Sequence, residues 1–476
     1  MGAENWEELR ERAHAVKEHT TNNLDFYLEK FSANVERLGG HVFWAGTSDE
    51  ACRYIVKLSY RHGVKEIVKS KSMMTEEIGL NRVLAEAGIK AIETDLGEYI
   101  VQLAHERPSH INMPAIHKTR SEVADLLAEK LGVERTEEIS EMTALARRVL
   151  RERFAEAGMG ITGVNYAVAE TGTIVLVENE GNIRLTTSLP RVHVAIMGIE
   201  KVIPALQDLE VFLKLLSRSA SGQKMCSYVS LLTGIKSSAS EEGPEEFHVV
   251  LIDNGRVEIL ADEHLRESLY CIRCGACLNV CPVYRKIGGH AYGWVYPGPI
   301  GAVLTPQMIG LGPAAALPFA SSLCGACGDV CPVKIKLPNM LLHLRGEIKE
   351  NGHISSRLTS IDRQAWNASE TRNSTNDQSE NSDGQSRLGR SREYWTNVFE
   401  HLGFKLWVAA MRNSRRYQYA ARLARLVQAV LGKRNSNGDL VLRLPRWTIT
   451  RNLPPLPRHS FREQWREQPR GSGRPQ

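Results

Sequence analysis

The sequence has no long hydrophobic run. Its most apolar stretch, Pro299 to Leu323, is interrupted by Pro306, Pro313 and Pro318 and by several glycines. A membrane-spanning helix needs about 20 consecutive, mostly apolar residues, so this stretch is expected to be a loop and not a span. The first residues are acidic and precede no apolar segment, so no secretory signal is expected.

Several motifs for organic cofactors and nucleophilic catalysis are also missing. No G-x-G-x-x-G follows a predicted strand, because the loose look-alike Gly158-Met-Gly160-Ile-Thr-Gly163 follows a predicted helix. There is no phosphate-binding P-loop and no G-x-S-x-G nucleophile elbow. The chain therefore offers no hydride acceptor of its own.

Cysteine is scarce except in one region. Seven of the nine cysteines fall between residues 271 and 331, in two runs. The first run, Cys271-x2-Cys274-x2-Cys277-x3-Cys281-Pro282, is the bacterial ferredoxin pattern, and the second is Cys324-x2-Cys327-x3-Cys331-Pro332. Short loops of this kind wrap three thiolates around a compact iron–sulfur core, and Gly275 and Gly325 allow the tight turns. Zinc knuckles and disulfides fit this spacing less well.

The second run lacks its first cysteine, because Ser321 stands at that position. In two-cluster ferredoxins the fourth cysteine of each run binds the other cluster. We therefore predict two clusters with the ligand sets Cys271, Cys274, Cys277 and Cys331 for the first, and Cys281, Cys324 and Cys327 for the second. The first is expected to be [4Fe–4S]. The second is either [4Fe–4S], with serine or an exogenous ligand on its fourth iron, or [3Fe–4S].

The remaining cysteines, Cys52 and Cys226, lie far from the runs and are expected to be buried packing residues. Thiolates that bind iron require a reducing compartment, so we expect a cytoplasmic protein. The apolar stretch between the two runs is then expected to form a loop over a cluster.

Charge is distributed unevenly. The net charge is +5, but residues 401–476 contain 16 Lys and Arg against 3 Asp and Glu, which leaves about −8 for residues 1–400. The basic end is either a docking surface for an acidic partner or a membrane surface, or simply a solvated helix with an arginine-rich tail. Its aromatic residues are too scattered for a base-stacking platform, so no nucleic-acid partner is expected.

Periodicity divides the chain into five parts. Residues 1–39 are predicted to be helical, 40–255 an α/β domain, 256–350 a two-cluster domain, 351–393 a polar, partly disordered linker, and 394–476 a basic region with a helix and an extended Pro/Arg segment. Strands are predicted at 41–45, 66–69, 90–94, 164–169, 173–177, 192–197 and 248–253. Helices are predicted at 5–38, 75–87, 97–105, 121–131, 136–157 and 394–431.

The whole chain resembles the lactate utilization protein B family. The resemblance rests on both cysteine runs and on the segments 71–77, 93–98, 108–118, 169–173, 189–193 and 447–465. It implies that residues 40–255 are similar in fold to sugar-phosphate isomerases and CoA transferases, followed by a mainly α-helical ferredoxin-type domain and a helical or extended C-terminal region. It also implies that the incomplete second cysteine run is usual in the family.

The resemblance further implies a role in oxidising L-lactate to pyruvate, with this chain carrying electrons between partner subunits and an electron acceptor. Two neighbouring clusters suit this role, because lactate releases two electrons and each cluster accepts one. Two alternatives are a redox enzyme that acts on a small organic acid in its α/β domain, and a cluster-containing regulator that binds nucleic acid.

Substrate chemistry on this chain would need residues of the α/β domain. Glu170, at a predicted turn, is a candidate general base. The candidates for holding a carboxylate are His110, His117, Lys118, Arg191 and His193, and of these His110 and His193 are also candidate catalytic residues. Each also has an ordinary structural explanation, because turns favour small polar residues and histidines near strand ends are usually solvated or hydrogen-bonded.

Overall fold

The computed structural model describes residues 5–236, 243–350, 402–403, 405–434, 440–441, 456–457, 459 and 465. The chain divides into two compact units, residues 1–377 and 378–476.

Two N-terminal helices precede the sheet. Helix α1 (Trp6–Asn22) begins where the Asn5 side chain accepts a hydrogen bond from the Glu7 N–H, and α2 (Leu24–Arg37) follows after a break at Asn23. The predicted helical segment 5–38 therefore consists of two helices, which are separated at Asn23. The left-handed Gly39 (φ 83°) turns the chain into the first strand.

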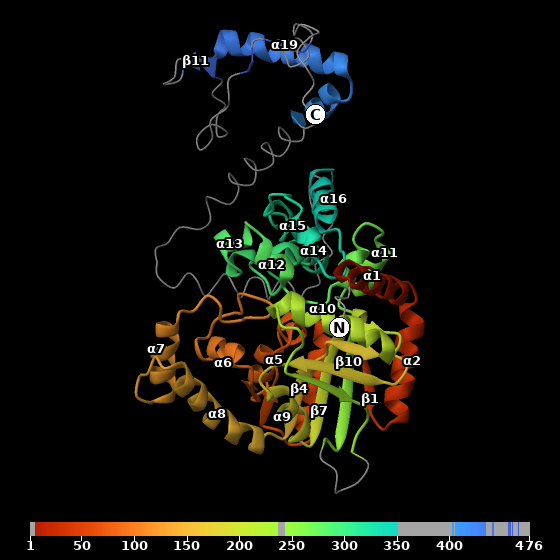
Figure 1. Cartoon of the computed structure of the whole chain (residues 1–476), viewed down its shortest axis with the longest axis vertical. Coiled ribbons are helices and arrows are strands. Elements are labelled where there is room, and N and C mark those ends of the chain that lie inside the picture. The colour runs from red at the N-terminus through yellow and green to blue at the C-terminus, as the bar shows by residue number, and fades with distance from the viewer. Residues whose placement is uncertain are drawn as a thin grey trace, which may run out of the picture. The chain divides into compact units, whose positions relative to one another are not determined.

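The first unit is built on a six-stranded parallel sheet (Figure 1). In spatial order its strands are β1 (His41–Ala45), β10 (Glu246–Ile252), β7 (Val192–Gly198), β4 (Met159–Gly163), β2 (Glu66–Lys69) and β3 (Lys90–Glu93). The chain passes from β2 outward to β3, and then from β4 through β7 to β10 in the opposite direction. The order therefore reverses between β2 and β4, which is where α/β sheets bind ligands.

Apolar side chains cover both faces of this sheet. On β7, Val194 and Ile196 join one core cluster, while Ala195 and Met197 join a second cluster on the other side. Because parallel strands are buried on both faces, they form continuous apolar runs, and these runs made β7 and β10 predictable.

The helices around the sheet have the following bounds: α3 (Ser48–Arg61), α4 (Met73–Glu77), α5 (Leu80–Glu86), α6 (Leu96–Leu103), α7 (Arg120–Leu131), α8 (Ile139–Glu156), α9 (Asn182–Ser188) and α10 (Leu206–Ser221). The helix predicted over residues 75–87 is two helices, because Gly79 adopts a left-handed conformation (φ 63°) between α4 and α5. The other predicted helices of this domain are confirmed to within a few residues.

A second, four-stranded sheet packs beside the first. Its order is β8 (Val202–Ile203), β5 (Tyr166–Val168), β6 (Thr173–Glu178) and β9 (Tyr228–Leu232). Strands β5 and β6 form the predicted antiparallel hairpin around Gly172 (φ 71°). A side chain at Gly172 would lie 2.8 Å from the backbone of α2, so the turn also needs glycine for space.

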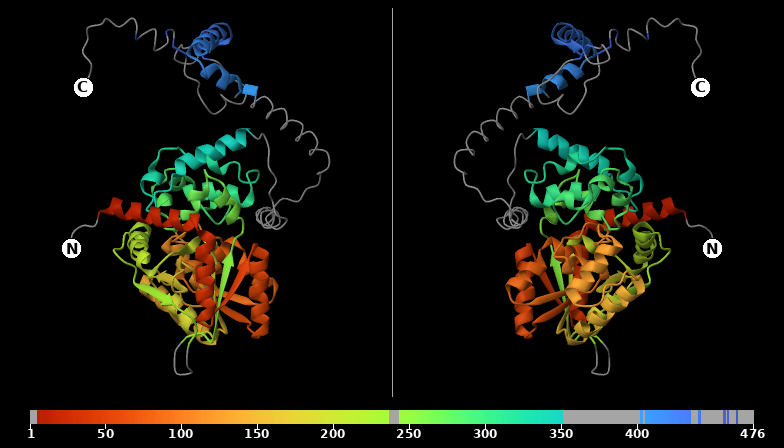
Figure 2. Two further views of the ribbon diagram at one scale, coloured as in Figure 1. Left: turned by 90° about the vertical axis from the view of Figure 1, so that its right-hand side faces the viewer. Right: turned by 90° about the vertical axis from the view of Figure 1, so that its left-hand side faces the viewer.

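Short helices between residues 256 and 350 complete the described residues of the first unit and pack against the α/β part (Figure 2). They are α11 (Arg256–Ala261), α12 (Ala276–Val280), α13 (Tyr284–Ile287), α14 (Gly298–Ile309), α15 (Ala326–Asp329) and α16 (Leu337–Glu350), with 3₁₀ turns at Ile199–Lys201, Arg266–Tyr270, His290–Tyr292 and Leu317–Phe319. One apolar cluster contains Phe212 and Leu215 of α10 together with Leu278, Leu304 and Leu341 of the helical part. The two parts therefore share a core.

The loop predicted over residues 299–323 is wrong for its first half. That half is helix α14, which has Pro299 in its first turn and Pro306 inside it. Proline is tolerated in the first turn because its missing N–H would have no partner there. No helix among the described residues is both long and apolar enough to cross a membrane.

In the second unit, residues 405–411 are helical, α19 spans Ser414–Leu431, and β11 (Lys433–Arg434) pairs with β12 (Leu440–Val441). This confirms helix over the later part of the predicted segment 394–431. The polar segment 366–392 and nearly all of the extended segment 444–465 lie outside the described residues.

Candidate cluster-binding centre and adjoining cavity

The seven cysteines of the two runs lie in the helical part of the first unit. Five are buried and belong to the shared core, Cys271 is half-buried and Cys324 is exposed. The two runs have similar backbones: Gly275 and Gly325 both adopt left-handed conformations (φ 75° and 90°) and start the short helices α12 and α15. The tight turns expected at these two glycines are therefore present.

Electrostatic coupling separates the thiols into two groups. Burial raises the pKa of Cys274 and Cys277, and the thiolates of Cys271 and Cys331 raise it further. Burial also raises the pKa of Cys331 to about 11, with a further contribution from Cys271. These four thiols are thus close neighbours, and they are the set predicted to bind the first cluster.

The other three thiols form the second group. Burial raises the pKa of Cys327 to about 11, and Cys281 and Cys324 raise it further. The membership of both groups agrees with the predicted ligand sets, whose assignment to clusters stays a prediction.

Backbone N–H groups point at these sulfurs. The N–H groups of Arg273, Tyr284 and Ile335 donate to the sulfurs of Cys271, Cys281 and Cys331 over 3.4, 3.5 and 3.4 Å. Such bonds stabilise thiolates, as iron ligation requires. Arg273 and Leu323, each directly before a cysteine, have positive φ (60° and 55°), so the loops are held in a conformation that side-chain-bearing residues rarely adopt.

The spacing of the sulfurs suits a cluster better than a single zinc ion. Four sulfurs around one zinc lie about 3.8 Å apart, given a Zn–S bond of about 2.3 Å and tetrahedral geometry. In the described part of the chain, no three cysteine sulfurs lie within 4.8 Å of one another. This spacing differs from that of four sulfurs around one zinc ion.

Ser321 stands at the incomplete corner of the second group. Its hydroxyl oxygen accepts the Leu323 N–H over 3.1 Å, and its carbonyl accepts from Arg345 over 2.9 Å. The neighbouring Ser322 hydroxyl and the Ala326 N–H interact with the Cys324 thiol, and the Ala326 N–H, followed by Ser322, lowers the pKa of that thiol. Ser321 is therefore hydrogen-bonded within its own loop.

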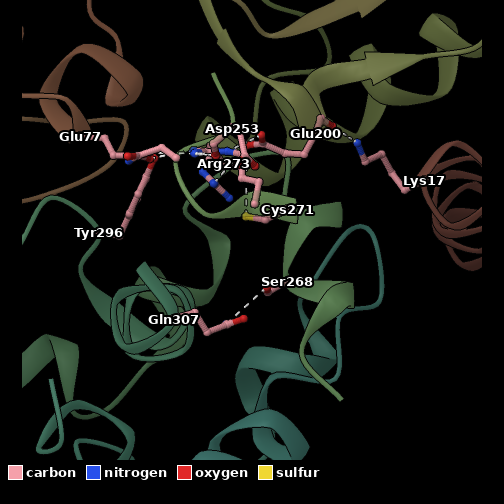
Figure 3. A network of polar contacts seen from close by, with 11 residues as sticks. Lys17, Glu77, Glu200, Asp253, Ser268, Cys271, Arg273, Tyr296 and Gln307 are labelled. Carbon is pink, nitrogen blue, oxygen red and sulfur yellow. Dashed lines mark hydrogen bonds and ion pairs between the residues drawn. The ribbon is translucent and has the colours of Figure 1, made fainter. Parts of the chain in front are cut away.

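A buried ion network lies beside the first cysteine group (Figure 3). The Arg256 guanidinium is completely buried and donates to both carboxylate oxygens of Glu77 over 2.9 and 2.8 Å and to Glu200 over 2.7 Å. The Tyr296 hydroxyl donates to Glu77 over 2.6 Å. Burial acts to raise the pKa of Glu200, but Arg256 and Arg273 lower it to about 2.

This network carries more positive than negative charge. Its cations are Lys17, Lys201, Arg256 and Arg273, and its carboxylates are Glu77 and Glu200, so two positive charges remain uncompensated. Lys17 donates to the Glu200 carbonyl. An iron–sulfur core held by four thiolates is anionic, so a positive surrounding of this kind fits it.

A cavity of about 950 Å³ lies between the sheet and the cysteine region. Residues at the carboxyl ends of three central strands line it: Lys71 and Ser72 after β2, Gly163 to Asn165 at β4, and Ile196 to Gly198 at β7. Ile272 and Arg273 of the first cysteine run close the opposite side. The cavity is thus at the point where the strand order reverses, and it reaches the loop of the first cysteine group.

Three cations line this cavity without a full set of partners. Lys201 makes no hydrogen bond or ion pair within the described ranges, and its pKa is lowered to about 8 by burial and then by Arg273. Arg273 contacts Glu200 over 3.4 Å and lies over the Tyr296 ring, but its buried Nη1 has no hydrogen-bond partner. Among the described residues, Lys71 donates only to the Asn112 carbonyl, over 2.8 Å.

Of the candidate substrate residues, only His110 lines the cavity. Its Nδ1 accepts the N–H groups of Asn112 and Met113 over 3.0 and 3.2 Å, so its Nε2 carries the proton and contacts the Asn279 side-chain oxygen over 3.2 Å. Burial lowers the pKa of His110, with a smaller effect from Lys71. His110 is therefore neutral and fixed in orientation.

The other candidates lie elsewhere. Glu170 is exposed and accepts the Leu206 N–H over 3.1 Å, and Arg191 pairs with Glu245 over 2.7 Å. His193 is buried within β7 beside Thr162 (2.9 Å) and Phe247. The structure does not bring these three to the cavity, because Glu170 belongs to the hairpin turn, and Arg191 and His193 to the start of β7, at the opposite end of the strand.

His117 and Lys118 are also absent from the cavity lining. Both pair with Glu106, His117 over 2.7 Å, so neither is free to bind a carboxylate as predicted. Lys201 and Arg273, which line the cavity, were not predicted as binding residues. The signal that was available for Lys201 is its position four residues after the predicted strand 192–197, at a strand end where ligand-binding groups gather.

The two cysteines outside the runs differ from each other. Cys52 is buried, as predicted, and its thiol lies 3.5 Å from the Ile78 carbonyl. Cys226 is only half-buried and lines the cavity, so the prediction of a buried packing residue is wrong for it.

Comparison with known proteins agrees with this division. Residues 28–252 match the LUD domain, and residues 267–335 match a 4Fe-4S dicluster domain that includes all seven cysteines of the runs. Lactate utilization protein B of Shouchella clausii is 51% identical over 347 residues, which cover 73% of each chain. The chain belongs to the lactate utilization protein B family.

Two further relatives match the chain over a similar length. Lactate utilization protein B of Geobacillus sp. is 51% identical, and the Escherichia coli protein named uncharacterized electron transport protein YkgF is 50% identical, each over 73% of both chains. Residues of both the LUD domain and the dicluster domain line the cavity in this family member, so the cavity lies between the two domains.

Proposed function

We propose that the chain is the iron–sulfur electron-transfer subunit of a system that oxidises L-lactate to pyruvate. The observation that carries the proposal is the pair of neighbouring cysteine groups in one core, beside a buried network with two uncompensated positive charges. Relatives with 50–51% identity that are named for lactate utilization or for electron transport support it.

Cys271, Cys274, Cys277 and Cys331 would hold one [4Fe–4S] cluster, and Cys281, Cys324 and Cys327 the second cluster, of the [4Fe–4S] or [3Fe–4S] type. When bound, each cluster takes up and passes on one electron. Oxidation of lactate to pyruvate releases two electrons and two protons, so two clusters in one core divide the electron pair. The chain's own residues hold the thiolates, supply N–H groups to them and provide the surrounding positive charge.

The proposal includes partners. Other subunits of the lactate-oxidising complex deliver the electrons, and a separate acceptor removes them. The cytoplasm suits the iron-binding thiolates because it keeps them reduced. The basic C-terminal region would make a peripheral contact with an anionic membrane surface.

The test is anaerobic iron and sulfide analysis combined with electron paramagnetic resonance, before and after reduction, on protein isolated with and without its partners. We expect two clusters per chain, with L-lactate reducing them only when the partner subunits are present. Iron-free protein, or zinc in place of iron, would contradict the proposal. Reduction by L-lactate in the isolated chain would instead support an enzyme that acts in its own α/β domain.

A further inference from the structure

We propose that the cavity at the carboxyl edge of the sheet is a binding site for a small organic acid, whose carboxylate is held by Lys201 and Arg273. The proposal rests on the function proposed above only for the choice of acid, since the incompletely paired Lys201 and Arg273 indicate an anionic ligand. Nothing in the electron-carrier role requires such a site, so this is an additional function of the chain.

The cavity is built from parts that are far apart in the sequence. The loop after β2, the ends of β4 and β7, the end of α10 and the first cysteine run all contribute to its walls. Its volume of about 950 Å³ lies within the range of small-molecule sites. Its position where the strand order reverses is the usual ligand position in open α/β sheets.

The lining carries four basic residues, Lys71, Lys201, Arg273 and Arg285, and four acidic ones, Asp95, Glu178, Glu180 and Glu200, so the charge of the ligand is inferred from the cations that lack a full set of partners. Arg273 is 8% exposed, and its Nη1 is buried without a hydrogen-bond partner. Lys201 makes no contact with a carboxylate or carbonyl in the part of the chain that the structure describes, although it lines the same cavity. A guanidinium with a free N–H, next to a free ammonium group, is suited to a carboxylate, which accepts two parallel hydrogen bonds from a guanidinium.

The remaining lining identifies an organic acid as the ligand in preference to inorganic phosphate. Apolar residues of the lining that are at least partly exposed, among them Met73, Met113 and Ile183, can contact the carbon atoms of an acid. A phosphate site in an α/β protein is normally built from a glycine-rich loop with successive free N–H groups, and the sequence contains no such loop. Inorganic phosphate is therefore the competing anion to be tested.

Arg273 links this site to the first cysteine group. It lies between Cys271 and Cys274, and its backbone N–H donates to the Cys271 sulfur over 3.4 Å, while its side chain lines the cavity. A bound carboxylate would neutralise part of the positive charge beside this group. Since reduction adds negative charge to a cluster, the bound acid should shift the reduction potential of the first cluster to a more negative value.

The experiment uses the full-length, anaerobically prepared, iron-containing protein. Isothermal titration calorimetry with pyruvate, L-lactate and inorganic phosphate measures affinity and stoichiometry. We expect both acids to bind at one site per chain and to compete with each other, and phosphate to bind at least about tenfold more weakly. We also expect pyruvate to lower the potential of the first cluster in a redox titration followed by electron paramagnetic resonance.

Lys201→Gln removes one cation without breaking a hydrogen bond of the described structure, so it should fold and retain its iron. It should weaken pyruvate binding by about tenfold to a hundredfold, the usual effect of losing a hydrogen bond to a charged group. The matched control is Lys57→Gln, an exposed lysine on α3 that lies outside the cavity and should bind as the unmodified chain does. If Lys201→Gln loses iron, Lys71→Gln replaces it, with a decrease in affinity again expected.

Absence of saturable binding by either acid would overturn the proposal, as would pyruvate binding that is unchanged in Lys201→Gln and Lys71→Gln. Phosphate binding as tightly as pyruvate would overturn the assignment to organic acids. These results are separate from the test of electron transfer. If pyruvate binds but the clusters are not reduced with the partners present, only the electron-transfer role fails; if reduction succeeds without acid binding, only the cavity proposal fails.

Discussion

Arg256 shows how much depends on single buried charges in this chain. It belongs to α11, yet it contacts Glu77 of α4 and Glu200 beside β7, so it joins segments that are about 180 residues apart in the sequence. Each partner is buried as completely as Arg256 itself. Removal of the guanidinium leaves the buried Glu77 carboxylate without a cation among its described partners and Glu200 with only the 3.4 Å contact to Arg273, which is far more costly than losing an exposed pair.

We therefore expect Arg256→Met to lower the free energy of unfolding by about 3–5 kcal/mol. The measurement is urea denaturation of anaerobic protein followed by circular dichroism. The control is Arg53→Met, which removes an exposed ion pair with Asp49 and should change stability by less than about 1 kcal/mol. Equal effects of the two substitutions would contradict the importance of the buried network.

His193 allows a test of pH dependence. Burial, followed by the charge of His248, lowers the pKa of His193 to about 3. In the unfolded chain its pKa is about 6.5, so below this pH the unfolded state binds a proton that the folded state excludes. Stability should therefore fall as the pH decreases from about 6.5 toward 3.

The substitution His193→Gln removes this titration and retains an amide able to contact Thr162. Between pH 7.5 and 5.5, we expect the unmodified chain to lose stability more steeply than the variant, by up to about 1.4 kcal/mol per pH unit below 6.5. Urea midpoints at several pH values measure this difference. His19→Gln, at an exposed site, should leave the slope unchanged, and an unchanged slope in His193→Gln would show that His193 is charged in the folded chain.

At the scale of elements, most long apolar strands and several amphipathic helices were predicted, whereas the amphipathic helices α3 and α10 and the elements with unusual composition were not. Strand β4 was missed because Gly160 and Gly163 made its sequence read as a loop. It is a central strand, and Gly160 is needed because α9 crosses it closely: a Cβ there would lie 1.9 Å from the Thr186 carbonyl oxygen. Helix α14 was missed because its prolines were taken as breaks, although Pro299 occupies the first turn.

Gly160→Ala should therefore separate β4 from α9 and destabilise the first unit by about 2–3 kcal/mol, in the upper part of the range for overpacking. Thermal or urea unfolding measures the loss. Gly346→Ala is the matched control, because Gly346 lies within α16 with nothing within 4 Å of its added Cβ, and alanine favours a helix. A neutral effect of Gly160→Ala would mean that α9 can move away without cost.

At the scale of the whole molecule, the two kinds of site differed in how far they were predictable. The cysteine groups were predictable because short loops fix which sulfurs can meet, so the spacing Cys271-x2-Cys274-x2-Cys277 carries most of the geometry. The cavity was not predictable from the sequence, because Lys71, Lys201 and Arg273 come together only through the order of the strands and the packing of the helical part on the sheet. Glu170 and Arg191 were chosen from local patterns that do not contain this information.

The distribution of the cysteines predicts how single substitutions affect the iron content. Cys274 is buried and electrostatically coupled to Cys271 and Cys331, so Cys274→Ala removes a thiolate from the first group and should abolish its cluster and lactate-dependent electron flow. Ser321→Ala should leave the first cluster intact, because Ser321 is hydrogen-bonded within its own loop beside the second group. Cys52→Ala, a buried cysteine in the α/β part, controls for the loss of a buried thiol.

Iron and sulfide analysis, with electron paramagnetic resonance of the reduced protein, distinguishes these three variants. We expect about half of the iron to be lost in Cys274→Ala and none in Cys52→Ala. Ser321→Ala should change at most the signal of the second cluster, since only that cluster adjoins residue 321. Electron flow at the normal rate through Cys274→Ala would mean that the first cysteine group is not on the path of the electrons.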